Sequence, residues 1–309
     1  MNVNWKGVFP AVTTKFNEDY TINIDGFQHN IAAQLDAGVN GIILGGTLGE
    51  ASVLTSAEKS TLVHASLDVV AGKIPVIINI AEQTTQGAIE AAMQAEKDGA
   101  QGLMMLPPMR YLADDAETVA YFAAVATATE LPIMIYNNPV DYKIEVTLDM
   151  FEQLSQYNNI QAVKESTRDI TNVTRMINRF GDRYSMLSGV DTLAVESMVM
   201  GANGWVAGLV CAFPKETVTI YQLVQAGRIA EAIDIFRWFL PLLELDINTK
   251  LVQNIKLAEE KVGLGSETVR PPRKPLHGQE RADVLKIIEE GIANRPILPE
   301  IALTEDLMA

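Results

Sequence analysis

Short apolar segments alternate with longer amphipathic segments over the first 225 residues, and this alternation limits the chain to few folds. In the short segments nearly every position is apolar, whereas a strand with one solvated face is apolar only at every second position. Uniform apolarity is typical of parallel strands that are covered on both faces. About eight segments follow this pattern: 7–14, 41–46, 75–80, 102–107, 132–137, 160–166, 184–189 and 204–209.

The intervening segments have the properties of helices. Segment 84–99 begins with threonines that suit a helix N-cap, carries alanines on one face and ends at a glycine, and segments 56–71, 114–129 and 169–180 are similar. About eight strand–helix units, roughly 20–35 residues apart, predict a (β/α)8 TIM barrel over residues 1–225. A doubly wound open sheet shares the alternation. The number of units and the absence of Gly-x-Gly-x-x-Gly after the first strand favour the barrel.

No strand pattern continues beyond about residue 225. Segments 228–245, 249–263 and 280–294 are predicted helices, and the stretch 263–275 between the last two contains three prolines. We therefore expect residues 226–309 to form a helical extension packed on the barrel.

Composition excludes several functional classes. The net charge of −15 opposes binding to nucleic acids and to anionic membranes. Cys211 is the only cysteine, so no internal disulfide forms, and His29, His64 and His277 lack metal-ligand spacing. Residues 1–6 contain no apolar signal segment, and no apolar run approaches the ~18 residues of a membrane span. The sequence predicts a cytoplasmic protein without a metal.

Catalytic residues of TIM barrels lie where the strands end and the following loops begin. This rule reduces the chain to a short set of candidates: Thr13, Thr14, 45–50, Asn79, 107–111, 136–139, 164–166, 188–191 and 206–208.

Lys164 is the most informative candidate, because it follows four residues of a predicted buried strand. Burial of a lysine without a partner lowers its pKa, and a neutral amine is a nucleophile that forms a Schiff base with carbonyl compounds. The alternative is an ion pair with a carboxylate such as Glu165. Glu165 is a poor partner, since side chains alternate across a strand.

Two further features lie at predicted strand ends. Tyr136 is either a core aromatic residue or, beside Lys164, an acid–base group that transfers protons during imine chemistry. Residues 45–50 (Gly-Gly-Thr-Leu-Gly-Glu) form either an ordinary glycine-rich turn or a cradle whose N–H groups bind a carboxylate, with the Thr47 hydroxyl beside it. Glu50 is expected to be structural and to hold loop N–H groups.

Around these residues the chain resembles the dihydrodipicolinate synthase/N-acetylneuraminate lyase family of class I aldolases. The resemblance covers about residues 7–300. Its motifs occur in the order of the family: 46–50 (Gly-Thr-Leu-Gly-Glu), 136–139 (Tyr-Asn-Asn-Pro), 163–166 (Val-Lys-Glu-Ser), 188–191 (Ser-Gly-Val-Asp) and 201–208.

The resemblance implies a homotetrameric barrel that acts on a small 2-oxo acid and needs no cofactor. Lys164 would form the imine with the ketone, and Tyr136 would transfer protons while Thr47 orients it. The amides of Thr47 and Leu48 would bind the substrate carboxylate. Around these, the resemblance gives binding roles to four further residues: Gly46, Gly189 and Val206 as pocket lining, and Asp191 facing distal hydroxyls.

Several positions depart from dihydrodipicolinate synthases. Leu48 replaces a threonine, so a carboxylate contact there depends on the backbone. Asp141 occupies the position of the arginine that binds the semialdehyde carboxylate in those enzymes. Their tyrosine after the fourth strand, which a neighbouring subunit donates, is also missing, and Tyr111 replaces it only if the loop is shifted.

The combination of segments 106–111, 136–139 and 268–273 resembles the dehydratase and deaminase branch. The preferred activity is deamination of 1-pyrroline-4-hydroxy-2-carboxylate to 2,5-dioxopentanoate. A retro-aldol lyase or dehydratase of 2-oxo-3-deoxy sugar acids is the first alternative, and dihydrodipicolinate synthase follows it. Arg110 either binds a carboxylate at the pocket mouth or is a solvated surface residue. A catalytically inactive, ligand-binding barrel is the non-enzyme alternative.

Overall fold

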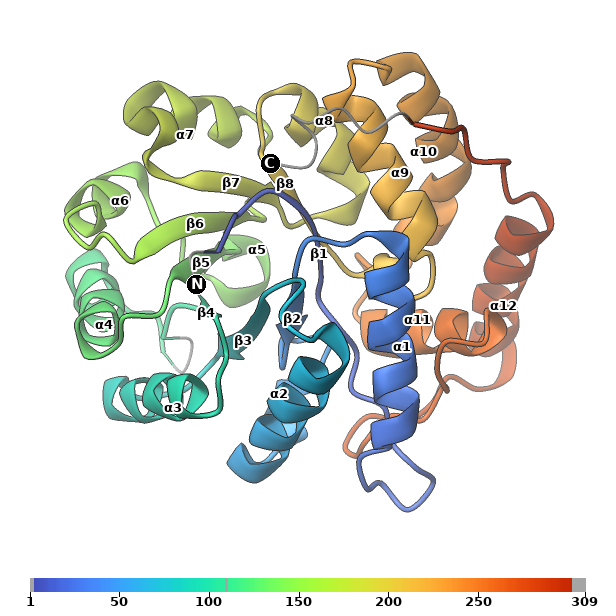
Figure 1. Ribbon diagram of the computed structural model, residues 1–309, viewed down its shortest axis with the longest axis horizontal. Coiled ribbons are helices and arrows are strands. Elements are labelled where there is room, and N and C mark those ends of the chain that lie inside the picture. The colour runs from blue at the N-terminus through green and yellow to red at the C-terminus, as the bar shows by residue number, and fades with distance from the viewer. Residues whose placement is uncertain (1–2, 109–110, 302–309) are drawn as a thin grey trace.

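A single sheet of eight parallel strands forms the centre of the computed structural model, which describes residues 3–108 and 111–301 (Figure 1). The strand order is β1-β8-β7-β6-β5-β4-β3-β2. The strands are β1 (Gly7–Pro10), β2 (Ile42–Leu44), β3 (Val76–Ile80), β4 (Gly102–Met105), β5 (Ile133–Asn137), β6 (Ile160–Glu165), β7 (Ser185–Ser188) and β8 (Gly204–Ala207).

The sheet closes on itself between β1 and β2. Ala11, directly after β1, forms a parallel bridge with Ile43 of β2, and the N–H of Val12 donates to the Ile43 carbonyl at 2.9 Å. Each remaining pair of neighbours in the barrel is joined by a parallel ladder. The closed ring confirms the predicted TIM barrel and excludes the open sheet.

Burial explains why the strand segments are apolar throughout. Apart from Gln161 and Ser185, which are partly buried, every strand residue is buried. One face of each strand packs inside the barrel and the other packs against the surrounding helices, so neither face tolerates a run of solvated side chains.

Helices surround the barrel (Figure 1). Thr84 caps α3, and Thr55 and Asp114 form capping boxes with Glu58 and Glu117 at the starts of α2 and α4. The four helices predicted here from sequence are present, with ends that differ by at most two residues. The helices of this part are α1 (Ile24–Ala37), α2 (Ser56–Val70), α3 (Thr85–Lys97), α4 (Asp115–Ala128), α5 (Pro139–Tyr142), α6 (Leu148–Leu154), α7 (Thr171–Phe180), α8 (Ala194–Val199) and α9 (Pro214–Gln225).

Three further helices follow α9: α10 (Ile229–Leu243), α11 (Leu251–Lys261) and α12 (Gly278–Ala293). They pack beside α9 and α1 on one side of the barrel (Figure 1). The ring of Phe239 on α10 lies 5.6 Å from that of Phe213, which precedes α9, and the Trp238 indole donates to the Gly291 carbonyl of α12 at 3.0 Å. Apolar side chains of α10 and α11 are therefore continuous with the core of the barrel.

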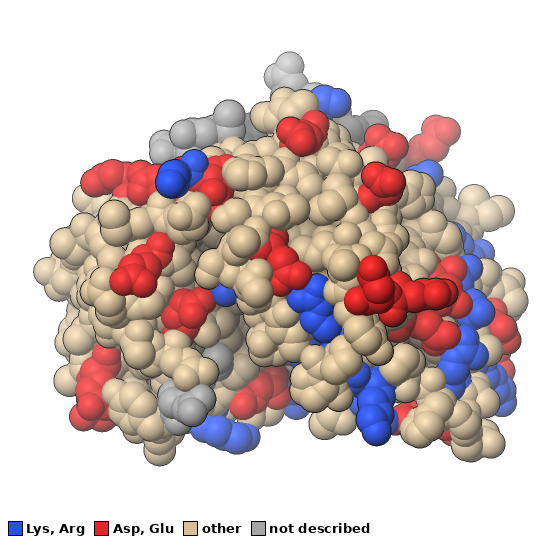
Figure 2. Space-filling model, turned by 90° about the horizontal axis from the view of Figure 1, so that it is seen from below, with Lys and Arg blue, Asp and Glu red and all other residues tan. Residues whose placement is uncertain are grey.

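The molecular surface carries both signs of charge. On the face drawn in Figure 2, acidic side chains are interspersed with lysines and arginines. Among the described residues, no helix combines the length and apolar character needed to cross a membrane.

Candidate active site

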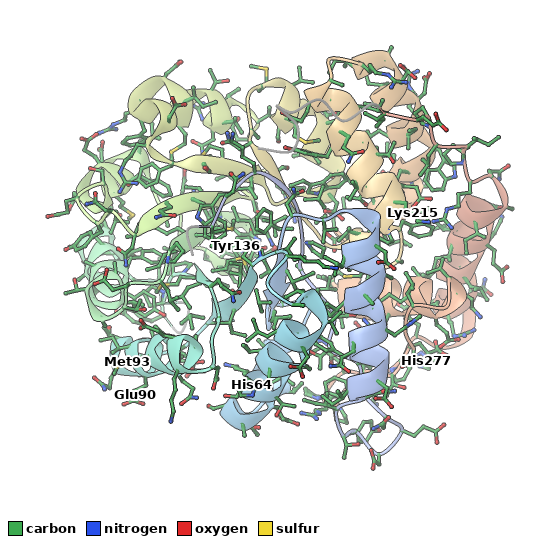
Figure 3. The ribbon with its side chains drawn as sticks, viewed as in Figure 1. His64, Glu90, Met93, Tyr136, Lys215 and His277 are labelled. Atoms are coloured by element: carbon green, nitrogen blue, oxygen red, sulfur yellow. The ribbon has the colours of Figure 1, made fainter. Side chains whose placement is uncertain are left out.

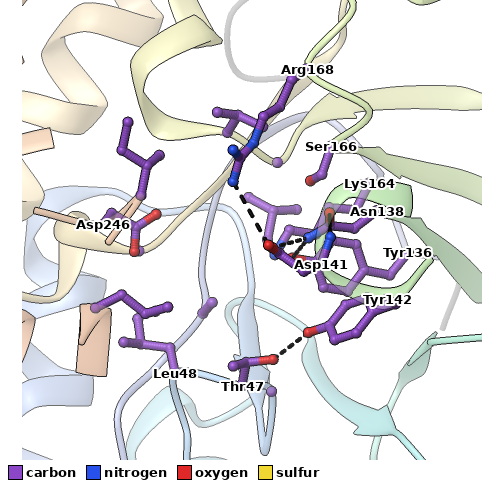
Figure 4. Close-up of a pocket in the computed structure, with 18 of the residues that line it drawn as sticks. Thr47, Leu48, Tyr136, Asn138, Asp141, Tyr142, Lys164, Ser166, Arg168 and Asp246 are labelled. Carbon is purple, nitrogen blue, oxygen red and sulfur yellow. Dashed lines mark hydrogen bonds and ion pairs between the residues drawn. The ribbon is translucent and has the colours of Figure 1, made fainter. Parts of the chain in front are cut away.

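A cavity of about 230 Å³ lies at the carboxyl ends of the strands (Figure 4). Most of the residues that sequence analysis assigned to a site line this one cavity. They are Gly46, Thr47, Leu48, Tyr136, Lys164, Gly189 and Val206.

Lys164 and Tyr136 are neighbours on adjacent strands. The parallel register of β5 and β6 pairs these two residues, so their side chains leave the sheet on the same face. The Lys164 amine lies 4.0 Å from the centroid of the Tyr136 ring. Tyr136 lies inside the barrel in Figure 3, and both side chains are buried. The strand pairing alone therefore brings the candidate nucleophile beside the candidate acid–base group.

Glu165 does not pair with the Lys164 amine. Its carboxylate accepts hydrogen bonds from the Thr167 N–H and the Asn172 amide, each at 2.7 Å. These contacts lie on the opposite face of β6, as the alternation of side chains predicts. Burial lowers the pKa of Lys164, and the negative charges of the nearby acidic groups oppose this shift only in part. A larger fraction of the amine is therefore in the neutral, nucleophilic form than for a solvated lysine at the same pH.

Gly189, which follows β7, leaves room for the lysine. A Cβ atom at this position would lie 2.6 Å from Cγ of Lys164 and 2.1 Å from the Ser166 hydroxyl oxygen. Any larger residue would displace the amine, so the glycine shapes this wall of the cavity.

Thr47 contacts a different tyrosine from the one expected. Its hydroxyl lies 2.5 Å from the hydroxyl of Tyr142, whereas Asn138 donates to the Tyr136 hydroxyl at 3.1 Å. The rings of Tyr142 and Tyr136 meet edge to face, with centroids 5.6 Å apart. The expectation that Thr47 orients Tyr136 directly is therefore wrong, because Tyr142 lies between them (Figure 4).

The position of Tyr142 follows from a local sequence signal. Asn138 accepts from the Asp141 N–H and caps α5, and Pro139 occupies the first position of this helix. The single helical turn places Tyr142 at its end, above Tyr136. Burial raises the pKa of both phenols, that of Tyr136 to about 12. Both are therefore protonated at neutral pH and able to donate.

The loop after β2 has the features of a carboxylate cradle. Gly45 adopts a positive φ of 62°, which turns the backbone at the strand end. Among the described residues, no acceptor takes a hydrogen bond from the N–H groups of Thr47 and Leu48, which belong to cavity-lining residues. Glu50 is buried and structural, as expected. It binds the N–H of Arg270 at 3.1 Å and the amine of Lys256 rather than N–H groups of its own loop.

Asp191 does not line the cavity. Its buried carboxylate accepts hydrogen bonds from the Trp205 indole at 2.8 Å and from the backbone N–H groups of Gly208 and Leu209 at 3.2 and 2.9 Å. These hydrogen bonds fix the position of the loop after β8. The expectation that Asp191 faces substrate hydroxyls is replaced by a structural role, since its acceptor sites are occupied by protein donors.

Of the residues around the fourth strand end, Arg110 lies outside the described residues. Tyr111 is 55% exposed and does not line the cavity.

Sequence analysis missed five polar cavity residues: Tyr142, Arg168, Asp246, Asn248 and Thr249. Arg168 follows β6, and its guanidinium lies 3.8 Å from the carboxylate of Asp141. Asp246 follows α10 and reaches the cavity from outside the barrel (Figure 4). Burial raises the pKa of Asp246 well above its usual value, and the charge of Asp191 raises it further.

Metal-binding side chains are dispersed. His64 and His277 lie on outer parts of the molecule, away from Tyr136 (Figure 3). Within residues 3–108 and 111–301, no group of three or more His, Cys, Asp or Glu side chains is arranged to hold a metal ion.

Comparisons with known proteins match nearly the whole chain. The model of the dihydrodipicolinate synthetase family matches residues 4–291. The 4-hydroxy-tetrahydrodipicolinate synthase of Methanopyrus kandleri is 30% identical over 302 residues, which are 97% of this chain and 99% of that protein.

Solved structures of similar proteins share the fold. A dihydrodipicolinate synthase from Bacillus anthracis, 26% identical, superposes with a TM-score of 0.89 over 93% of this chain and 99% of that one. A monomeric dihydrodipicolinate synthase variant, 23% identical, has a TM-score of 0.88 over 93% of this chain and 97% of that one. With the family model and the buried lysine at the strand ends, these matches lead to one conclusion: the chain belongs to the dihydrodipicolinate synthetase family of class I aldolase-type lyases.

Proposed function

We propose that this protein is a Schiff-base lyase that binds a 2-oxo acid, or a cyclic imine derived from one, through Lys164. The observation that carries the proposal is the buried amine of Lys164, which lies in the cavity, 4.0 Å from the centroid of the Tyr136 ring. Glu165 does not pair with this amine, because its carboxylate accepts hydrogen bonds from other residues. A buried amine with a lowered pKa beside a phenol is suited to imine formation.

In the first step, the Lys164 nitrogen attacks C2 of the substrate. A 2-oxo acid gives a carbinolamine, which loses water to form an iminium ion, whereas a cyclic imine gives a geminal diamine, which forms the iminium by expelling the ring nitrogen as an amine. Each stage requires a proton to be added or removed. We assign these proton transfers to the hydroxyls of Tyr136, Tyr142 and Thr47. The Tyr142 hydroxyl is hydrogen-bonded to that of Thr47 at 2.5 Å, and the Tyr142 ring meets the Tyr136 ring edge to face. The iminium then acts as the electron sink for loss of a proton from C3.

The substrate carboxylate is assigned to the loop after β2. The unused N–H groups of Thr47 and Leu48 are suited to an anion, and Leu48 offers only its backbone for this purpose. With C1 bound there and C2 attached to Lys164, the remaining carbons extend towards Asp141, Arg168 and Asp246.

The carboxylate of Asp141 opposes a distal anion at this end of the cavity. The carboxyl group of Asp246, whose pKa is raised, is suited to a hydrogen bond with a substrate hydroxyl, so the two residues together favour a hydroxylated substrate. We therefore retain 1-pyrroline-4-hydroxy-2-carboxylate as the preferred substrate. Loss of its 4-hydroxyl as water, followed by hydrolysis, yields 2,5-dioxopentanoate and ammonia. Retro-aldol cleavage or dehydration of 2-oxo-3-deoxy sugar acids uses the same imine.

Synthesis of 4-hydroxy-tetrahydrodipicolinate is the second candidate. It is favoured by the names of the relatives and by Arg168, a cation at the cavity that could bind the carboxylate of a semialdehyde. Asp141 opposes this assignment, because its carboxylate lies 3.8 Å from the same guanidinium. The cytoplasmic location and the homotetramer implied by the resemblance remain part of the proposal.

Reduction with borohydride in the presence of pyruvate tests the Schiff base. We expect one reduced adduct per chain, on Lys164, detected by mass spectrometry of peptides, and none in Lys164→Met. An unmodified protein across a panel of 2-oxo acids would reject the proposal and favour the inactive barrel.

The same preparation ranks the substrates. Ammonia release from 1-pyrroline-4-hydroxy-2-carboxylate supports the deaminase. Pyruvate release from sugar acids without ammonia supports the aldolase, and consumption of pyruvate only in the presence of aspartate semialdehyde supports the synthase. Light scattering of the eluted protein measures the number of chains in the assembly.

A further inference from the structure

Asp246 is a cavity residue with no role in imine formation. It follows α10 of the helical extension, and its carboxyl group faces the cavity from the side opposite Lys164 (Figure 4). Among the described residues, no donor or cation occupies this carboxyl group, whereas Asp141 has Arg168 and Asn138 as partners. Asp246 is therefore available to a ligand.

The barrel makes room for this side chain at Gly208. A Cβ atom there would lie 2.4 Å from Oδ1 and 2.9 Å from Cγ of Asp246. Gly208 has a φ of −100°, which any residue can adopt, so the backbone conformation does not require glycine. The close approach of the Asp246 carboxyl group is what excludes a larger residue. The N–H of the same glycine donates to Asp191, which holds the residue in place.

The charged groups around Asp246 come from three other parts of the fold. Lys164 faces it from β6, Asp191 from the turn after β7, and Asp141 from α5. Burial and the charge of Asp191 both favour the protonated form of Asp246, and only Lys164 opposes them. When the Lys164 nitrogen is uncharged, as it is in the enamine, this opposition is lost, and the partly buried carboxyl group of Asp246 holds its proton more strongly.

We propose that Asp246 is the acid that protonates the departing C4 hydroxyl of a 4-hydroxy-2-oxo substrate, so that this site eliminates water. The inference rests on the proposed Schiff base at Lys164. It names the substrate class as 2-oxo acids or cyclic imines with a hydroxyl at C4, and it assigns the choice of reaction to a residue of the extension.

The step balances as follows. Loss of the C3 proton from the iminium gives an enamine. The nitrogen lone pair then re-forms the C2=N bond, the C2=C3 electron pair forms C3=C4, and the C4–O bond breaks. Asp246 gives its proton to the leaving oxygen, water departs, and the carboxylate that remains recovers a proton equivalent to the one released from C3.

An ionised Asp246 would have the opposite effect, because it would remove the proton of the C4 hydroxyl and favour cleavage of the C3–C4 bond. The protonation state of one carboxyl group therefore decides between dehydration and retro-aldol cleavage of the same imine.

Asp246→Asn separates this step from the imine chemistry. Exchange of the pyruvate methyl protons in D2O, followed by NMR, reports formation of the iminium and enamine without any leaving group. We expect this exchange to change by less than about threefold in Asp246→Asn, and turnover of 1-pyrroline-4-hydroxy-2-carboxylate or 2-oxo-3-deoxygluconate to fall about 100-fold or more. Glu244→Gln, an exposed neighbour at the end of α10, is the matched control and should resemble the wild type.

Two further measurements distinguish an acid from a structural residue. The decrease in wild-type turnover at high pH should be absent in Asp246→Asn, and Asp246→Glu should restore part of the rate. Gly208→Ala should reduce turnover of the hydroxylated substrate more than it reduces proton exchange.

The failures are distinguishable. No exchange and no reduced adduct in the wild type would reject the Schiff base itself. Normal exchange with unchanged turnover in Asp246→Asn would reject the acid role alone, as would a wild type that exchanges pyruvate protons but eliminates water from neither hydroxylated probe.

Discussion

The amine of Lys256 lies 2.5 Å from the carboxylate of Glu50, and both side chains are fully buried. Lys256 belongs to α11 in the helical extension, whereas Glu50 ends the loop that carries Thr47. The same carboxylate accepts the backbone N–H of Arg270 at 3.1 Å. The extension therefore holds the far end of the loop to which we assign the substrate carboxylate.

Removal of one partner from this ion pair is expected to destabilise the protein strongly. Lys256→Met leaves a buried carboxylate without its main cation, and such changes cost about 3–5 kcal/mol. Urea denaturation measures the free energy of unfolding. The double variant Glu50→Gln/Lys256→Met should be more stable than Lys256→Met, because no uncompensated charge remains.

Lys250→Met is the control, since Lys250 forms an ion pair with Glu280 in which both side chains are exposed. We expect a loss of at most about 1 kcal/mol. Equal losses in the two lysine variants would contradict the importance of the buried pair.

Tyr142→Phe tests the proton relay. The variant keeps the ring that packs on Tyr136 but removes the hydroxyl that contacts Thr47. We expect the reduced pyruvate adduct to persist, while exchange of the methyl protons slows by about 100-fold. Tyr111→Phe, at an exposed position, should exchange at the wild-type rate. Full exchange activity in Tyr142→Phe would remove this residue from the relay.

The pH dependence of imine formation reports the environment of Lys164. Because only the neutral amine attacks the carbonyl, the rate of adduct formation rises with pH through the pKa of Lys164 and then levels off. Burial lowers this pKa, so the midpoint of the rise should lie below 10.5, the ordinary value for lysine. A midpoint at or above pH 10.5 would indicate a solvated amine.

Asp141→Arg tests the second candidate function. This substitution supplies the cation that dihydrodipicolinate synthases have at the position. We expect turnover of hydroxylated substrates to survive with a raised KM, since the new guanidinium occupies the end of the cavity near Arg168. If the native reaction is the synthase reaction, the variant should instead consume aspartate semialdehyde with a lower KM than the wild type. Steady-state kinetics with both substrate classes distinguish these results.

Much of the fold could be predicted from sequence because each strand is covered on both faces. Uniformly apolar segments, capped helices and glycines at helix ends are local signals, and they located the eight strands, the predicted helices and the extension. Lys164 and Tyr136 were identifiable for a related reason. A polar residue at the end of a buried strand of a barrel points to the site, and strand pairing brings the two together.

The rest of the site depends on contacts between loops that are distant in sequence. Asp246 lies between two helices of the extension, in a stretch with no motif, and only packing against Gly208 brings it to the cavity. Asp191 follows a strand end like the true cavity residues, yet the Trp205 indole of the next strand engages its carboxylate. Tyr142 had a signal in the Asn138 cap and Pro139, although its contact with Thr47 required the loop after β2 to be placed as well.

The attachment of Asp246 to the linker between α10 and α11 has an evolutionary consequence. Imine formation depends on residues of the barrel strands, where substitutions would destabilise the fold. The reaction of the remaining substrate carbons depends on Asp246, which lies in a linker outside the barrel. After gene duplication, this connection can diverge while the ancestral lysine chemistry is preserved. New reactions could therefore arise within the family by substitutions in this linker, without changes to the barrel.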